Sequence, residues 1–418
     1  MESRSNSSVA YALTSAVRAA AILAALSTTL SLTGCGAMCA IGVAPHGDKN
    51  AQAVKTRPAS HRPPFPGGTG DDIDSPLPQT VNVFGEVNGA SPRAGMSGDV
   101  AFQQHTFADE GYDADVCVDP TGKWLVFAST RNSEHPSIYL QRVDGTAVTQ
   151  LTDGTCDDAY PVFSPDGKQI AFCSTRAGNW QIYSMDADGR NVVQLTTGPM
   201  QGVHPSFNPD GTRLVYCSIG GRSGQWELWT LDLKTSEKRM IGYGVFPTWS
   251  PDRQVNRIAF QRARQRGSRW FSLWTIDLVD GEGRRPTEVA ASTNAAILSP
   301  SWSPDGKRIA FTTVVQPGKG SEPHPRGQTD VWTINADGSN RQRLTDGRGN
   351  NLMPFWAPDR RVYFVSDRGG TESIWSVRAE PTHDTAVADL KTEKKPEPPI
   401  AEKKPNPTVG AADPAEPR

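Results

Sequence analysis

The sequence contains few cysteines for its length and almost no net charge. Six cysteines among 418 residues are too few for the disulfide framework that supports small secreted domains. A formal net charge of −2 provides neither the global basic field that favours nucleic acid nor an acidic field for cationic partners. We therefore expect no nucleic-acid partner.

The internal cysteines do not define a redox site. Cys173 and Cys217 each directly follow an apolar triplet, at equivalent places of two successive repeats. Small buried side chains are their expected role. Cys117 and Cys156 come from neighbouring repeats, and the sequence leaves open whether they, or Cys173 and Cys217, form a disulfide.

Linear catalytic motifs are also absent. The chain has no Gly-x-Ser-x-Gly elbow, no His-Glu-x-x-His, no paired Cys-x-x-Cys and no phosphate-binding glycine loop. We expect no enzymatic activity, no cofactor and no metal site. A propeller enzyme such as a polysaccharide lyase or hydrolase gathers its acids from several repeats, so it stays open as the least favoured alternative.

The apolar run near the N-terminus is short. It spans residues 19–32, whereas a membrane-spanning helix takes about 20 residues. Arg4 and Arg18 both precede the run, as positively charged residues do in a signal peptide. The run ends in Leu32-Thr33-Gly34-Cys35, which resembles the lipobox of bacterial lipoproteins.

The lipobox resemblance implies a signal peptide over 1–34 and a diacylglyceryl group on the Cys35 thiol. Several acyl chains, at about 0.8 kcal/mol per buried CH₂, would hold the protein stably on a membrane of the periplasm. Gly36 stands where an inner-membrane retention signal would carry Asp, which favours the outer membrane. An ordinary signal peptide with an incidental cysteine is the alternative.

Two segments have the composition of flexible linkers. Residues 35–98 are rich in Pro and Gly and poor in apolar residues, which predicts a lipidated tether. Residues 380–418 are rich in Lys, Glu and Pro, which predicts a disordered tail. The folded body should therefore span 99–379.

A repeat fills that body. The motif Pro-x-aromatic-Ser-Pro-Asp-Gly, followed by an apolar triplet, begins at Pro161 and Pro300, and at Pro205 with Asn208 in place of the serine. Degenerate copies begin at Val116, Pro247 and Pro354. The copies lie roughly 42–54 residues apart. Each copy continues with an apolar-aromatic pair typical of a third strand, namely Ile138-Tyr139, Ile182-Tyr183, Leu228-Trp229, Leu273-Trp274, Val331-Trp332 or Ile374-Trp375. Six such units predict an all-β, six-bladed propeller of four-stranded antiparallel blades.

The motif has a structural explanation. Pro presets φ, Asp bonds its own backbone and Gly takes the positive φ that closes the hairpin. Arg253 and Arg360 replace that glycine in copies four and six, so those turns should differ or carry strain. The aromatic residue before the turn should pack between blades, which stabilises the fold by about 2–3 kcal/mol per side chain. These aromatic residues are Phe163, Phe207, Trp249, Trp302 and Trp356.

Closure of the ring has a specific candidate. Gln104-His105-Thr106 precedes the first copy as Gln150-Leu151-Thr152 precedes the second, whereas the last copy stops near Ala379 without a fourth strand. We predict that residues 99–107 supply the outer strand of blade six. This N-terminal strand would close the ring and remove an exposed sheet edge.

These motifs, over roughly residues 100–379, resemble the TolB-like propeller repeats. The resemblance implies a periplasmic module that binds proteins, notably a peptidoglycan-associated lipoprotein and components of the Tol system. Two features depart from the TolB pattern: a tether stands in place of a folded α/β domain, and Cys35 indicates lipidation. We therefore interpret the chain as TolB-like in the sense of a protein-binding scaffold.

Two groups of side chains are candidate sites. Residues shortly before the first-strand proline should line the mouth of the propeller channel: Asp158, Tyr160, His204, Ser299, Asn351 and Met353. Loop capping or channel lining is the plainer interpretation, and binding of a carbohydrate or peptidoglycan fragment is the functional one. Arginines along one hairpin of blade four form a candidate patch for an anionic partner: Arg262, Arg264, Arg266 and Arg269.

Overall fold

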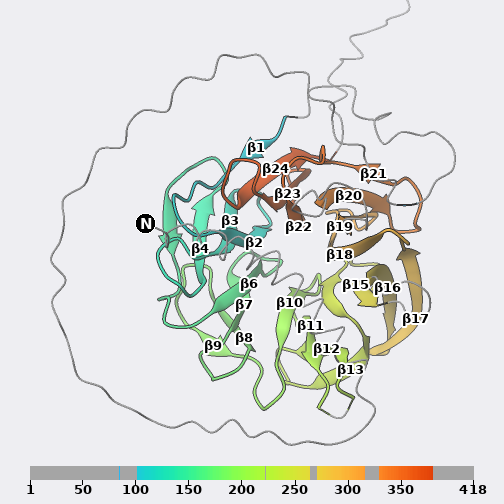
Figure 1. Cartoon of the computed structure of the whole chain (residues 1–418). Coiled ribbons are helices and arrows are strands. Elements are labelled where there is room, and N and C mark those ends of the chain that lie inside the picture. The colour runs from blue at the N-terminus through green and yellow to red at the C-terminus, as the bar shows by residue number, and fades with distance from the viewer. Residues whose placement is uncertain (1–83, 85–100, 222, 264–270, 316–328, 380–418) are drawn as a thin grey trace, which may run out of the picture.

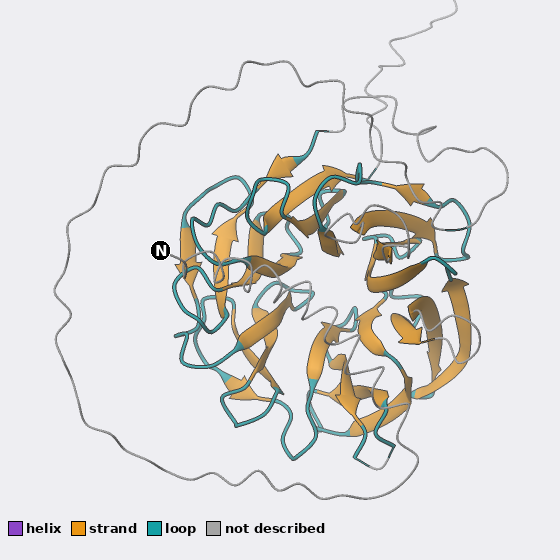
Figure 2. Ribbon diagram, in the orientation of Figure 1, coloured by secondary structure: helices purple, strands orange, loops and turns teal. Residues whose placement is uncertain are grey.

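The computed structural model describes residues 84, 101–221, 223–263, 271–315 and 329–379. They form six four-stranded sheets arranged around one axis (Figure 1), and their regular structure is strand alone (Figure 2). The predicted six-bladed, all-β propeller is confirmed. Within these ranges there is no helix of the length and apolar character needed to span a membrane. The predicted signal peptide, the tether with Cys35, and the C-terminal tail lie outside the described residues.

Every blade places its strands side by side in chain order, except where the closing strand joins blade six. Blade one contains β2 (Asp113–Val118), β3 (Trp124–Ser129), β4 (Ser137–Arg142) and β5 (Val148–Gln150). Blade two contains β6 (Asp158–Phe163), β7 (Gln169–Ser174), β8 (Gln181–Asp186) and β9 (Val193–Gln194). Blade three contains β10 (Val203–Phe207), β11 (Arg213–Ile219), β12 (Trp226–Asp232) and β13 (Lys238–Tyr243). Blade four contains β14 (Val245–Trp249), β15 (Arg257–Ala263), β16 (Phe271–Val279) and β17 (Glu282–Ala290). Blade five contains β18 (Ala295–Trp302), β19 (Arg308–Val315), β20 (Thr329–Asn335) and β21 (Gln342–Arg343). Blade six contains β22 (Asn351–Trp356), β23 (Arg361–Ser366), β24 (Ser373–Arg378) and the closing strand β1 (Gln103–Gln104).

The repeated turn joins the first two strands of a blade. In blade two, Gly167 has φ 71° and donates its N–H to the Ser164 carbonyl at 2.8 Å. The Ser164 hydroxyl donates to Asp166 Oδ1 at 2.6 Å, which fixes the carboxylate inside the turn. The sequence Ser-Pro-Asp-Gly therefore supplies both the left-handed residue and the side chain that caps it.

The two copies without the glycine behave as the sequence predicts. Arg360 takes the turn conformation itself, with φ 66°, which costs a side-chain-bearing residue on the order of 1 kcal/mol. Blade four uses a different turn, in which Val255 donates its N–H to the Asp252 carbonyl at 3.2 Å. Arg360 is thus accommodated with backbone strain, and Arg253 by a longer hairpin.

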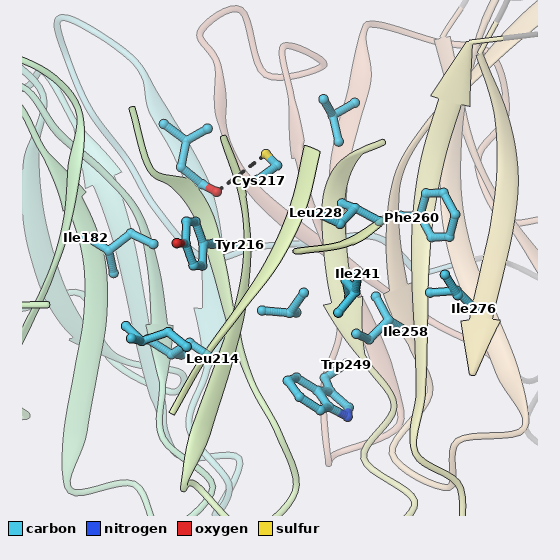
Figure 3. Close-up of a cluster of buried hydrophobic side chains, with 14 of the residues drawn as sticks. Ile182, Leu214, Tyr216, Cys217, Leu228, Ile241, Trp249, Ile258, Phe260 and Ile276 are labelled. Atoms are coloured by element: carbon cyan, nitrogen blue, oxygen red, sulfur yellow. Dashed lines mark hydrogen bonds between the residues drawn. The ribbon is translucent and has the colours of Figure 1, made fainter. Parts of the chain in front are cut away.

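Apolar side chains from neighbouring blades form continuous clusters. One cluster joins Ile182 of blade two, Leu214 and Leu228 of blade three, and Ile258 of blade four (Figure 3). The aromatic residue before each turn is at most 8% exposed, and the Trp302 indole donates to the Thr248 carbonyl of the preceding blade at 3.1 Å. The prediction that these aromatic residues pack between blades is confirmed.

The closing strand is where the sequence places it, but it is shorter than predicted. Only β1 (Gln103–Gln104) pairs with β24, where Gln104 lies opposite Trp375. The contact then continues through side chains: the Thr106 hydroxyl accepts the Ile374 N–H at 2.9 Å. Thr152 accepts the Ile138 N–H in the same way, also at 2.9 Å. The resemblance between Gln104-His105-Thr106 and Gln150-Leu151-Thr152 therefore reflects one bonding pattern.

The cysteine question is settled for the described residues. Cys117, Cys156, Cys173 and Cys217 are free thiols. Cys173 and Cys217 are fully buried, and the Cys217 thiol lies 3.5 Å from the Val203 carbonyl (Figure 3). Both fill space in the core, as their position after an apolar triplet predicts.

Candidate functional site

The innermost strand of every blade contains a β-bulge at the same position. In β6, for example, the pairing with β7 shifts between Ala159 and Val162. The first bulged residue has a positive φ in all six blades, although none of these residues is glycine. We call this set the axial ring; its members are Asp115 (φ 54°), Tyr160 (55°), His204 (56°), Phe246 (52°), Ser299 (51°) and Met353 (52°).

Two properties single out the axial ring. A side-chain-bearing residue at positive φ is strained, and such residues concentrate at functional sites. All members of the axial ring are half-buried, whereas the residues around them in the same strands are mostly buried. The inner strands of neighbouring blades contact one another, so the bulges meet around the propeller axis (Figure 1). The repeat thus holds one side chain from every blade at the centre.

Blades two to four contribute an aromatic arc to the axial ring. The centroid of the Tyr160 ring lies 3.8 Å from that of His204, and the His204 centroid lies 3.7 Å from that of Phe246. Burial between these two rings lowers the pKa of His204 to about 3, because the charged imidazolium would lose its hydration. At neutral pH the arc is therefore uncharged.

Asp115 stands next to this arc and supplies the only carboxyl group of the axial ring. The Tyr160 N–H donates to Asp115 Oδ2 at 3.3 Å, across the boundary between blades one and two. Burial raises the pKa of Asp115 to about 7, and this one backbone hydrogen bond opposes the shift only weakly. The carboxyl group therefore gains and loses its proton near neutral pH.

Asp158 and Asn351 occupy a different position from the axial ring. Both side chains are fully buried, two residues before the bulge of their strands. Arg176 lies 3.2 Å from the Asp158 carboxylate, and Arg368 donates to Asn351 Oδ1 at 2.9 Å. Asp158 and Asn351 are therefore bound to arginine side chains inside their blades and do not belong to the axial ring. The other four predicted residues, Tyr160, His204, Ser299 and Met353, do belong to it.

Sequence reasoning did not include Asp115 and Phe246. Both stand at the place that Tyr160 and His204 take in their own repeats, directly before the proline or, in blade one, before Val116. The missed signal was the register, because the candidate set combined residues one and three positions before the proline. A single register applied to all copies selects the whole axial ring.

Only one residue of the predicted arginine patch is described. Arg262 lies in β15 with its guanidinium 5.5 Å from the centre of the Trp274 ring. Arg264, Arg266 and Arg269 lie outside the described residues. Among the residues that are described, no group of three or more His, Cys, Asp or Glu side chains has the arrangement of a metal site.

Comparison with known proteins finds two families of β-propeller domain. Residues 110–256 match the TolB beta propeller domain family, and residues 189–395 match the Tricorn protease N-terminal beta propeller domain family. The Tol-Pal system protein TolB of Anaeromyxobacter dehalogenans is 30% identical over 138 residues, which are 32% of this chain and 27% of that protein. TolB of Alcanivorax borkumensis is 29% identical over 86 residues, 21% of this chain and 18% of that protein. The matched regions thus span about a quarter or less of these relatives.

Solved structures resemble the chain at a lower level of identity. TolB from Acinetobacter baumannii has a TM-score of 0.46 and 20% identity, covering 65% of this chain and 64% of that one. An oligogalacturonate lyase from Vibrio parahaemolyticus has a TM-score of 0.48 and 17% identity, covering 68% of this chain and 95% of that one. One of these two structures is that of a lyase and the other that of a TolB protein.

Proposed function

The chain belongs to the TolB-like β-propeller family, and from that premise we propose that it is a lipid-anchored scaffold of the periplasm that binds cell-envelope proteins through its propeller. The observation that carries the proposal is the family match over residues 110–256 together with relatives named as Tol-Pal system proteins. A peptidoglycan-associated lipoprotein or another Tol-system component is the expected partner. Cys35 would tether the scaffold to a membrane, with the outer membrane favoured.

The architecture suits a docking surface. Neighbouring blades are joined by side-chain hydrogen bonds as well as by the apolar core; the Trp356 backbone N–H, for instance, donates to the Ser301 hydroxyl of the preceding blade at 2.9 Å. Because the ring is closed in this way, its backbone loses little conformational entropy when a partner binds. Loops at the blade ends can then vary while the body stays fixed.

Crosslinking mass spectrometry on intact envelopes tests the scaffold. The full chain with an affinity tag, expressed in its own host, should crosslink through the propeller to one or a few envelope proteins. An unrelated lipoprotein carrying the same tag is the control for proximity on the membrane. Recovery of the same proteins with both baits, or of no envelope protein, would refute the proposal.

The anchor has its own test. Cys35→Ser removes the thiol that would carry the lipid, so the mature protein should move from the membrane fraction to the soluble periplasmic fraction. Cys39→Ser is the matched control, because it removes a nearby thiol without changing the lipobox. Equal membrane association of both variants would contradict lipidation at Cys35.

A second function is favoured by the aromatic arc. The aromatic rings are only half-buried and can offer apolar surface to a sugar, so a carbohydrate or peptidoglycan fragment is the alternative ligand of the axial ring. Muropeptide binding that is lost in His204→Ala and kept in Arg253→Ala, which lies in a turn away from the ring, would support this function. Equal binding by both variants, or no binding by the wild type, would remove it.

A further inference from the structure

Two acidic side chains on the inner strand of blade one have opposite surroundings. Asp113 is fully buried and lies 2.7 Å from Arg131, with which it forms an ion pair. Asp115, two residues on, is half-buried, and within the described part of the chain no Lys, Arg or His forms an ion pair with it. Buried carboxylates are normally paired, so an unpaired one beside the axis requires an explanation.

The neighbours of Asp115 define what kind of group could pair with it. Tyr160 places an aromatic ring on the next strand, and the rings of His204 and Phe246 continue that surface. Aromatic faces attract cations through the ring quadrupole, and a carboxylate supplies the compensating charge. Both features together favour an organic cation, since the carboxylate repels an anion and offers a neutral sugar hydrogen bonds but no charge attraction.

We propose that Asp115 and Tyr160 form a binding site at the propeller axis for an organic cation of the guanidinium or alkylammonium class. The cationic group lies against Asp115 Oδ1, the carboxylate oxygen that does not accept the Tyr160 N–H, and against the face of the aromatic arc. The source of the cation is either a free small molecule or an arginine or lysine side chain of a segment inserted along the axis. This site is independent of how an envelope protein docks on the outer surface of the propeller.

The site should respond to pH, and only through Asp115. With a pKa of about 7, the ionised fraction of Asp115 rises from about a tenth at pH 6 to about nine tenths at pH 8. The titratable groups that face it do not change charge in this range: burial holds the pKa of Tyr160 and Cys173 well above their usual values, and that of His204 at about 3. The ring residue that blade six contributes on the other side, Met353, carries no charge. Affinity for a cation should therefore rise about tenfold between pH 6 and pH 8.

The experiment is isothermal titration calorimetry on the full chain with three probes: methylguanidinium, a blocked Gly-Arg-Gly tripeptide, and the same tripeptide with citrulline in place of arginine. Citrulline keeps the shape of arginine and removes its charge, so the proposal expects at least tenfold weaker binding. Tighter binding of the arginine tripeptide than of methylguanidinium identifies an inserted side chain as the source. The reverse order identifies a free small cation. Either order supports the site.

Asp115→Asn separates charge from shape. The amide oxygen can still accept the Tyr160 N–H, so the variant should fold, and circular dichroism and thermal unfolding check this. The variant should bind both cations at least tenfold more weakly and lose the pH dependence. Arg253→Ala, in a turn away from the axis, is the matched control and should bind as the wild type does. Equal affinity for the arginine and citrulline tripeptides, unchanged binding by Asp115→Asn, or no binding of any probe by the wild type would overturn the proposal. None of these results depends on whether an envelope partner is found.

Discussion

Two positions of the same inner strand are used in opposite ways by the six blades. At the end of the strand the residue types repeat in blades two to six: an aromatic residue is followed by a turn with proline and aspartate. At the bulge the backbone repeats, with φ between 51° and 56°, while the side chain differs in every blade. Repeated residue types mark what folding requires. A repeated backbone with varied side chains marks a position that the fold holds in place while its side chain is free to vary.

Removal of the closing segment should have the largest effect on the repeated framework. Deletion of residues 36–107 from a soluble form that begins after Cys35 exposes the edge of β24 and removes the bonds of Thr106 and His105 to Ile374. The deletion also removes the bond between His105 Nε2 and the Ser376 hydroxyl and the bond from the Gln141 amide to the His105 carbonyl. At about 1 kcal/mol for each of the four hydrogen bonds, the loss is about 4 kcal/mol, and the open edge should promote association. Urea unfolding and size-exclusion chromatography measure both effects. Deletion of residues 36–98 is the control, and equal midpoints for the two forms would contradict closure by this segment.

The inter-blade aromatic residue should matter more for stability than the ring residue of the same strand. Trp356 is 4% exposed and packs between blades, so Trp356→Ala should lower the free energy of unfolding by about 3–5 kcal/mol. Met353, half-buried in the same strand, should cost less than about 1.5 kcal/mol on substitution by Ala. Chemical denaturation of both variants tests the contrast. Similar losses in the free energy of unfolding would show that the ring residue stabilises the fold as much as the inter-blade aromatic residue does.

The ring carboxyl should lower stability at high pH. Because folding raises the pKa of Asp115 from 3.8 to about 7, the folded state holds the proton more tightly than the unfolded state. Its stabilising contribution is complete below about pH 4 and is lost as pH rises to about 7, at no more than about 1.4 kcal/mol per pKa unit. Asp115→Asn should remove this decline and be more stable than the wild type by about 2 kcal/mol at pH 8. Parallel pH profiles of the two proteins would show that Asp115 titrates normally.

The smallest effect concerns the strained turn of blade six. Arg360 holds a φ of 66° that glycine adopts without strain, so Arg360→Gly should raise the free energy of unfolding by about 0.5–1 kcal/mol. Arg253 has no positive φ, and Arg253→Gly should not stabilise the protein. Thermal unfolding of the pair checks this. A gain at Arg253 equal to that at Arg360 would mean that the side chains, and not the backbone, account for the difference.

The sequence predicted the framework well because local chemistry determines it. Pro-Asp-Gly turns, apolar triplets and the Gln-x-Thr segments specify hairpins, core strands and closure, and each has a direct counterpart in the structure. The candidate site was predicted only in part. A bulge reverses which way a side chain points, so Asp158 lies in an ion pair inside the blade while Tyr160 reaches the ring. No local pattern marks a bulge in advance, and Asp115 acquires its raised pKa from burial in the assembled ring of blades.

The repeated turns and inter-blade aromatic residues should stabilise the fold, whereas the axial ring should serve binding. The sharpest test of this division is the triple variant Asp115→Asn, His204→Gln and Phe246→Leu. Thermal unfolding and the crosslinked partners in intact envelopes are measured on the same preparation. The account predicts a cooperative transition within a few degrees of the wild type, together with loss of cation binding and of any partner that inserts at the axis. A variant that unfolds far below the wild type would show that the axial ring is part of the framework. A folded variant that still binds the arginine tripeptide would show that the ring is not the binding element.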